Sequence, residues 1–245
     1  MKKVIFAMVL LFMGLALAVG SAEAFEEDTF DTSKGDLKIT FIGHGTLMIS
    51  FDGKIIHIDP VSQLADYTAL PKADLILITH HHGDHLDPQA IHILRKDNTK
   101  LIQTEMCREK IPWGTVMKNG DVKTVQDLEI KAVPAYNIQH MRSPGHPFHP
   151  KGEGNGYVIT FGDKRIYIAG DTENIPEMKA LEDVDAAFLP MNLPYTMTPD
   201  MVADAAKSFR PKILYPYHYG DTDTSSLLEL LKDEEGIEVR IRNMK

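Results

Sequence analysis

The chain has 245 residues, of which 43% are hydrophobic and 25% are charged, so it suits one globular domain with a sizeable core and is too short for two large domains. Its formal net charge of −9 at pH 7 gives no general attraction for nucleic acid or an anionic membrane, and neither is an expected partner. Cys107 is the only cysteine, which excludes an intramolecular disulfide.

Residues 1–24 have the pattern of a secretory signal peptide. Two lysines precede an apolar run from Val4 to Gly20, and Ala22-Glu23-Ala24 is a small-x-small sequence that suits signal peptidase. We predict cleavage after Ala24, export to the periplasm or the extracellular space, and no stable membrane insertion of the mature chain. An uncleaved anchor is the alternative, because the apolar run approaches the length needed to span a bilayer.

Short strand-like runs separated by turn residues follow a polar lead-in over residues 25–35. Alternating apolar residues and an Asp-Gly turn indicate a hairpin-rich sheet, with strands expected over residues 37–43, 46–53 and 54–60. The continuously apolar run 73–80 predicts a strand that is buried on both faces. Residues 87–96 predict a helix with Asp87 as the N-cap and Pro88 at the first helical position.

The second half of the chain has the same mixture of elements. Strands are expected near residues 122–134, 156–162, 164–170, 185–191, 212–218 and 237–241, and helices near 174–181, 198–208 and 224–233. This order predicts one α/β domain over residues 25–245, with helices packed outside two sheets.

Two segments in the first half of the chain are weakly similar to two in the second half, a pattern that we call an internal echo. "DGKIIHIDP" is similar to "GDKRIYIAGD", and "LITHHHGDH" is similar to "LYPYHYGDT". In each case a strand runs into polar or metal-ligating residues. The echo hints at two similar halves that face each other, with chemistry at the strand ends between them.

The segment "THHHGDHLD", residues 79–87, concentrates histidine and aspartate directly after a buried strand. Imidazole nitrogens and carboxylate oxygens are ligands that zinc accepts. Residues two apart on an extended segment share a face, so His80 and His82 can bind one metal while His81 points elsewhere. Gly83 lets the backbone turn and bring Asp84 and His85 to a neighbouring position. A solvated polar loop is the alternative, but the position at a strand end favours a metal site.

His80-x-His82-x-Asp84-His85 resembles the signature of the metallo-β-lactamase superfamily, whose fold is a four-layer αββα sandwich that carries one or two metals at one edge of its sheets.

Further motifs follow in the family's order over about residues 37–220. Asp59 resembles the family's early structural aspartate, Asp171 in "GDT" the aspartate that bridges two metals, and His218 in "PYHYGD" the last metal-binding histidine.

One more histidine ligand must come from residues 137–152. Pro144-Gly145-His146 resembles the Pro-Gly-His of many members, whereas the His-Pro-Lys-Gly that begins at His149 is similar to a branch near the ascorbate-phosphate lactonases and other UlaG-like hydrolases. We predict His149 as the ligand, with His146 as the alternative.

The resemblance implies two divalent ions: one held by His80, His82 and His149, and the other by Asp84, His85 and His218, with Asp171 bridging. It implies a hydrolase in which a metal-bridged hydroxide cleaves a small ester, lactone or phosphoester. Asp84 and Asp171 are the candidate catalytic carboxylates. The ligand types favour Zn²⁺, with Mn²⁺ or Fe²⁺ as alternatives. A non-catalytic periplasmic metal- or ligand-binding protein is the alternative function.

Residues outside the motifs receive simpler interpretations. His57 is expected to pack in the sheet, and His44 lies in a turn that could approach the site without an evident partner. Candidates for orienting a substrate or assisting the leaving group are Tyr136, Asn137, Lys151 and Tyr195, and a surface or structural role is the alternative for each.

Overall fold

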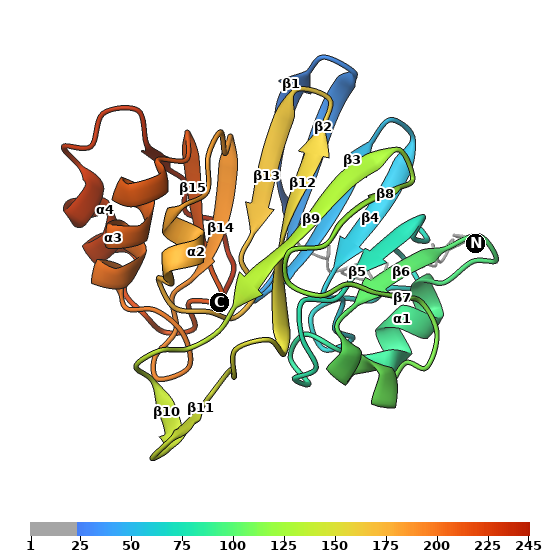
Figure 1. The fold of residues 1–245 in the computed structure, drawn as a ribbon. Helices are drawn as coiled ribbons and strands as arrows, with labels where there is room; N and C mark the ends of the chain where they lie inside the picture. Colours follow the sequence, from blue (N-terminus) through green and yellow to red (C-terminus); the bar gives the residue numbers. More distant parts are fainter. Residues whose placement is uncertain (1–23) are drawn as a thin grey trace, which may run out of the picture.

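The computed structural model describes residues 24–245, so the predicted signal peptide lies outside the described residues except for Ala24. Two seven-stranded sheets face each other, and helices cover their outer surfaces (Figure 1). One side carries α1 (Pro88–Leu94), and the other carries α2 (Pro176–Lys179), α3 (Pro199–Phe209) and α4 (Ser225–Leu231). The predicted four-layer αββα sandwich is confirmed.

The first sheet has the order β1-β2-β3-β4-β5-β6-β7. Its strands are β1 (Glu26–Thr32), β2 (Gly35–Gly43), β3 (Thr46–Phe51), β4 (Lys54–Ile58), β5 (Leu75–Leu77), β6 (Lys100–Gln103) and β7 (Thr115–Val116). Pairing is antiparallel from β1 to β4 and parallel from β4 to β7.

The second sheet has the order β16-β15-β14-β13-β12-β9-β8. Its strands are β8 (Val122–Val125), β9 (Leu128–Ala135), β12 (Gly154–Phe161), β13 (Lys164–Ile168), β14 (Ala186–Pro190), β15 (Ile213–Tyr217) and β16 (Glu238–Val239). Pairing is antiparallel from β8 to β13 and parallel from β13 to β16. Each sheet thus changes from antiparallel to parallel at one strand, β4 or β13.

Apolar side chains from both inner faces form the main core. Ile39 and Phe41 of the first sheet belong to the same buried cluster as Phe188 and Tyr215 of the second, and the rings of Phe188 and Tyr215 stack at 4.8 Å. A smaller cluster fills the space beneath α1, whose N-cap Asp87 accepts a hydrogen bond from the Gln89 backbone N–H at 2.8 Å as predicted.

Several elements differ from the sequence prediction. The polar lead-in forms the edge strand β1, and β6, β7, the 3₁₀ helix η1 (Glu105–Glu109) and a separate hairpin of β10 (Met141–Ser143) and β11 (His146–Pro147) were not predicted. The run 73–80 is a regular strand only over Leu75–Leu77. Beyond it, the Thr79 backbone binds Asp59 and Asn155, which draws the chain away from a regular ladder.

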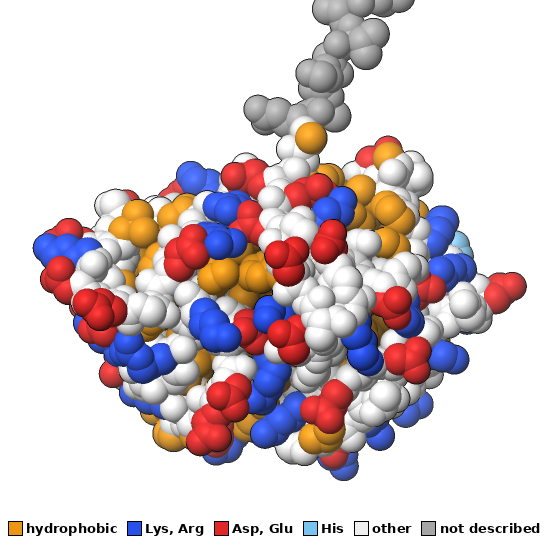
Figure 2. All heavy atoms as spheres, turned by 90° about the horizontal axis from the view of Figure 1, so that it is seen from above, with side chains coloured by type: hydrophobic (Ala, Val, Ile, Leu, Met, Phe, Trp, Pro, Cys, Tyr) orange, Lys and Arg blue, Asp and Glu red, His pale blue; other side chains and the backbone are white. Residues whose placement is uncertain are grey.

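The end of the sandwich that carries the β1–β2 and β12–β13 turns has acidic and basic side chains interspersed (Figure 2). Among residues 24–245, no helix has the length and apolar character required to cross a bilayer.

The polar strand β1 is fastened by the C-terminal segment. The Asp28 carboxylate accepts hydrogen bonds from the Arg242 guanidinium at 2.6 and 2.8 Å, from Arg240 at 3.3 Å and from the Tyr215 hydroxyl. Only 11% of the Asp28 side chain is exposed. This carboxylate therefore connects the edge of the first sheet to the chain that leaves the second.

Asp28→Asn is expected to lower the melting temperature, because charge-assisted hydrogen bonds contribute about 1.5–3 kcal/mol and each kcal/mol shifts Tm by roughly 2–4 °C at this size. Burial opposes ionisation of Asp28, but the bonds from Tyr215 and Arg242 hold its pKa below the usual 3.8. The contribution of Asp28 to stability is complete above its usual pKa of 3.8 and is lost as the pH falls through the lowered pKa of the folded protein.

The Tm difference between wild type and Asp28→Asn should therefore narrow below about pH 4. Asp31→Asn, on the same strand and exposed, is the matched control and should melt with the wild type. Calorimetry from pH 3 to 7 measures both effects. Equal melting of the two variants, or a gap that does not change with pH, would contradict this account.

Candidate metal centre

Polar residues that could hold metal meet at one end of the two sheets. Asp59 follows β4, residues 80–85 follow β5, Asp171 follows β13 and His218 follows β15. These strands all belong to the parallel parts of the sheets or border on them, so their carboxyl ends point the same way. Histidine and aspartate side chains from both sheets therefore meet in one place.

Three overlapping groups of potential ligand atoms lie there, each with its atoms within 4.8 Å of one another. The groups are His80, His82 and His149; His80, His85 and Asp171; and His44, Asp84, His85 and His218.

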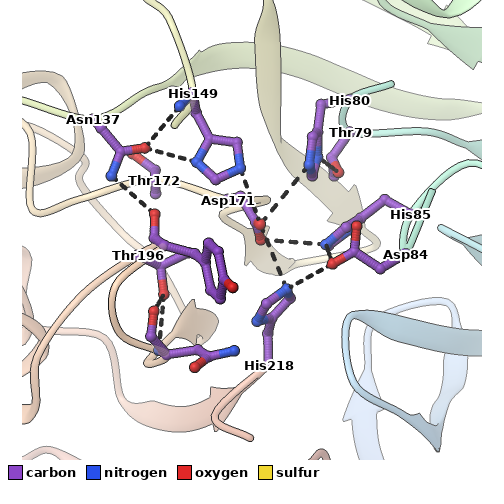
Figure 3. A network of polar contacts seen from close by, with 12 residues as sticks. Thr79, His80, Asp84, His85, Asn137, His149, Asp171, Thr172, Thr196 and His218 are labelled. Atoms are coloured by element: carbon purple, nitrogen blue, oxygen red, sulfur yellow. Dashed lines mark hydrogen bonds and ion pairs between the residues drawn. The ribbon is translucent and has the colours of Figure 1, made fainter. Parts of the chain in front are cut away.

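Asp171 lies at the middle of the cluster (Figure 3). Its carboxylate oxygens are 3.2 Å from His149 Nε2, 3.3 Å from His85 Nε2, 3.5 Å from His218 Nε2 and 3.8 Å from His80 Nε2. One carboxylate thus faces histidines of both predicted trios, as a bridging ligand must.

The residues present fit metal ions. Buried polar side-chain atoms almost always have partners, because an unpaired one costs about 1–3 kcal/mol. Within the described chain, His80 Nε2, His85 Nε2, His218 Nε2 and Asp171 Oδ1 are buried without a hydrogen-bond partner, although they face one another. Convergent unpaired imidazole nitrogens and a carboxylate are the donor set of a divalent metal site.

All seven residues predicted as ligands come together here, while the alternative third ligand does not. His149 is buried with its Nε2 near Asp171, whereas His146 is exposed on β11 and His140 binds Glu173 at 2.9 Å. His81 belongs to none of the potential ligand groups, as its place between His80 and His82 predicts.

A buried aspartate behind the cluster orients two of its histidines. Asp59 is fully buried and accepts from His85 Nδ1 at 2.8 Å and from the Thr79 backbone N–H at 2.8 Å. The Thr79 hydroxyl also donates to Asp59 and lies 3.0 Å from His80 Nδ1. A hydrogen-bond partner at Nδ1 fixes the orientation of a histidine ring, so that Nε2 points towards the place where a metal would bind.

The orientation of His149 depends on a second buried chain of polar groups. Its Nδ1 lies 2.7 Å from Asn137 Oδ1, and Asn137 Nδ2 donates to Glu173 at 3.0 Å. Glu173 is fully buried and also accepts three backbone N–H groups of residues 138–140. Of the two roles expected for Asn137, substrate contact and structural support, its contacts fit the second, because it holds the predicted ligand His149 from behind.

His44 is a member of the cluster that the motifs did not reveal. Its Nε2 lies 3.2 Å from Asp84 Oδ2, and its ring lies 3.7 Å from that of His218. His44 has φ 51°, a left-handed conformation that the adjacent glycines help the turn to reach. A Cβ on the next residue, Gly45, would come within 2.6 Å of the His85 ring, so the turn packs directly against a predicted ligand.

The remaining candidates lie elsewhere or at the edge of the site. Tyr136 donates to Glu177 at 2.9 Å, and Lys151 binds the same carboxylate at 2.7 Å. His57 is buried in β4, as expected, with its Nε2 3.1 Å from the Pro71 carbonyl oxygen. Of the predicted substrate contacts, Tyr195 borders the open space beside the cluster.

Burial and neighbouring charges shift the pKa values within the cluster in different directions. Burial alone would raise the pKa of Asp171, but the nearby His218 and His85 hold it well below its usual range. Burial opposes protonation of His85, whereas Asp171 and Asp59 raise its pKa. Burial and the nearby His149 lower the pKa of His82 to about 4. A metal that binds Nε2 of His85 must displace a proton there.

A cleft of about 390 Å³ opens onto the cluster. His82, Asp84, His149, Asp171 and His218 form its floor, and the remaining lining residues are His44, Gly83, Arg142, Phe148, Asn192 and Tyr195. This volume suits a small molecule.

Two stacked sheets between helix layers, with histidines and aspartates gathered at the strand ends, define a metallo-β-lactamase-type domain. The sequence profile described as "Beta-lactamase superfamily domain" matches residues 38–218. A UPF0173 metal-dependent hydrolase from Pelotomaculum thermopropionicum is 31% identical over 194 residues, which cover 75% of this chain and 84% of that protein. Another from Thermococcus kodakarensis is 32% identical over 196 residues, covering 75% of this chain and 84% of that protein.

Solved structures of similar proteins have the same fold. A Parabacteroides distasonis protein described as a metal-dependent hydrolase has 54% sequence identity and a TM-score of 0.86, covering 90% of this chain and 100% of that one. A metallo hydrolase from Ignicoccus hospitalis has 26% identity and a TM-score of 0.70, covering 85% and 96%. The chain belongs to the metallo-β-lactamase superfamily and, within it, to the UPF0173 metal-dependent hydrolases.

His149→Ala and His146→Ala form a matched pair that tests the third histidine ligand. His149→Ala removes one of the four protein ligands predicted for one ion, namely His80, His82, His149 and the bridging Asp171, and should lose about half of the bound metal. His146→Ala should keep the wild-type content, because its side chain is exposed outside the cluster. Elemental analysis of the purified proteins measures both. Loss of metal in His146→Ala alone would reverse the assignment.

Asn137→Ala should weaken metal binding by about 10–100-fold, the usual effect of removing the hydrogen-bond partner of a ligating histidine. Competition with a chromogenic chelator gives the affinity. Gln139→Ala is the control, because that side chain is exposed and only its backbone N–H binds Glu173. Equal affinities in the two variants would show that Asn137 does not support His149.

Proposed function

We propose that the mature chain is an exported hydrolase with two divalent ions that cleaves a small ester, lactone or phosphoester. The observation that carries this proposal is the position of the Asp171 carboxylate, within 3.8 Å of histidines from both trios and at the floor of an open cleft. Export follows from the signal-like residues 1–24.

The proposed ligands form two sets. His80, His82 and His149 would hold one ion and Asp84, His85 and His218 the other, with the Asp171 carboxylate lying near histidines of both sets. When bound, two such ions lower the pKa of water towards neutrality and polarise the scissile bond. Zinc is the proposed metal because nitrogen and carboxylate ligands suit it, with manganese and iron as alternatives.

The protein's own groups position this chemistry. Asp59, Thr79 and Asn137 hold the ligand rings from behind, so the ligand atoms need little rearrangement when metal or substrate binds. Asp171 is enclosed, whereas half of the Asp84 side chain is exposed at the cleft. The close imidazoles of His218 and His44 outweigh burial and hold the pKa of Asp84 well below its usual range, so it is ionised at neutral pH.

A lactone or related cyclic ester is the first substrate to test. The segment that begins His149-Pro-Lys-Gly is similar to UlaG-like hydrolases, and the buried position of His149 beside Asp171 supports the ligand role that this likeness implies. The cleft volume of about 390 Å³ favours a small substrate over a polymer.

A panel of lactones, carboxylic esters and phosphodiesters, assayed with Zn²⁺-, Mn²⁺- or Fe²⁺-loaded protein, tests the proposal. Wild type should hydrolyse at least one class, and Asp84→Asn should reduce kcat/KM by at least about 100-fold, since it removes a metal-binding charge. Asp31→Asn, on the edge strand β1, makes the same chemical change far from the cluster and serves as the control. No activity across the panel, or full activity in Asp84→Asn, would refute the enzyme and favour a metal- or ligand-binding protein.

A further inference from the structure

An unpaired arginine stands at the rim of the cleft. Arg142 is exposed on β10, whose hairpin with β11 projects from the body of the sandwich (Figure 1). It lines the cleft above the metal cluster and also a neighbouring hollow of about 400 Å³, and His82 and Phe148 border both spaces as well. The guanidinium group therefore stands where the two spaces join.

This guanidinium group has no acidic partner, although the chain carries an excess of acidic residues. Within residues 24–245, no carboxylate forms an ion pair with Arg142. Asp84 and Asp171 in the cleft face the histidines instead, and Glu153 lines the neighbouring hollow. Arg142 is also the only lysine or arginine of the described chain that lines either space.

Aromatic rings support the arginine on one side. Its guanidinium carbon lies 5.9 Å from the centre of the Phe148 ring, and Phe148 packs edge-on against Tyr195 at 5.1 Å. The Phe148 backbone N–H in turn donates to the His140 carbonyl at 3.4 Å, which connects the two ends of the hairpin. A cation–π contact with an aromatic face leaves the N–H groups of a guanidinium free to bind a carboxylate or phosphate.

We propose that Arg142 binds an anionic group of the substrate, a carboxylate or a phosphate, while the bond to be cleaved lies at the metal cluster. The substrate class is then a small ester or lactone that carries a negative charge away from its scissile bond. Phe148 and Tyr195 form the wall between these two ends. This inference rests on the proposed hydrolase function.

Two 4-nitrophenyl esters of matched length test the proposal. The hydrogen glutarate ester carries a free carboxylate where the valerate ester ends in a methyl group. Wild type should prefer the glutarate ester, and Arg142→Gln should lower its kcat/KM about tenfold, mainly through KM, since it loses a charge-assisted hydrogen bond. The valerate ester should be affected less than about twofold. Arg142→Lys keeps the charge but lacks the bidentate geometry, so its kcat/KM for the glutarate ester should lie between the values of wild type and Arg142→Gln.

Arg108→Gln is the matched control, because it removes the same charge from an exposed position that lines neither space. It should keep the wild-type preference between the two esters. Added salt should reduce the preference in wild type and have little effect in Arg142→Gln, because it screens an exposed ion pair. An unchanged preference in Arg142→Gln would overturn the proposal.

A binding measurement separates this proposal from the hydrolase function. Phenylacetate and benzylphosphonate cannot be hydrolysed, and calorimetry of the metal-loaded protein gives their Kd values. At least one Kd should rise about tenfold in Arg142→Gln, and the compound affected more strongly identifies a carboxylate or a phosphate as the preferred group. Equal Kd values in wild type and variant would refute the arginine site. Failure to cleave either ester, with the binding difference intact, would refute only the ester reaction.

Discussion

The buried carboxylate of Asp59 is the contact on which the metal centre depends. It lies just past β4, in a left-handed conformation with φ 44°, and accepts hydrogen bonds from Thr79 and His85 beyond β5. Burial raises its pKa, and these donors act against that rise. The strand ends are thereby held at one spacing, and His85 is turned so that Nε2 faces Asp171. A left-handed conformation is unfavourable for aspartate, so it persists only where surrounding contacts such as these hold the residue in place.

The strands and the part of the cluster in residues 80–85 could be predicted because their signals are local, whereas the places of His149, Asp171 and His218 came from the resemblance to the metallo-β-lactamase superfamily. Alternating apolar residues give the hairpins, and the parity of an extended segment separates His81 from His80 and His82. One of the two sequence echoes has a structural counterpart: β4 and β13 are the strands at which their sheets turn from antiparallel to parallel, and Asp59 and Asp171 follow them. The other does not, because β5 adjoins β4 whereas β14 separates β15 from β13.

The features that escaped prediction depend on contacts between distant parts of the chain. The strand β1 is polar, and its Asp28 is held by Arg242, 214 residues away. His44 meets Asp84 across 40 residues, and a lone histidine in a turn carries no spacing that could reveal it. The sequence leaves the role of Asn137 open between substrate contact and structural support, because only the fold shows which side of His149 it occupies. Positions of this kind follow from tertiary packing and have no periodic signal.

The two walls of the cleft come from different sheets, and one of the hydrogen bonds between them joins two residues of the cluster. The His218 backbone N–H, after β15, donates to the His44 carbonyl, between β2 and β3, at 3.0 Å, and both residues have positive φ. Two strained residues at about 1–3 kcal/mol each and unpaired buried imidazole nitrogens destabilise this part of the fold. Ligands shared between the walls would offset that cost, since an ion that binds only the folded chain stabilises it by mass action. A metal bound by residues from both walls would therefore also stabilise the folded chain.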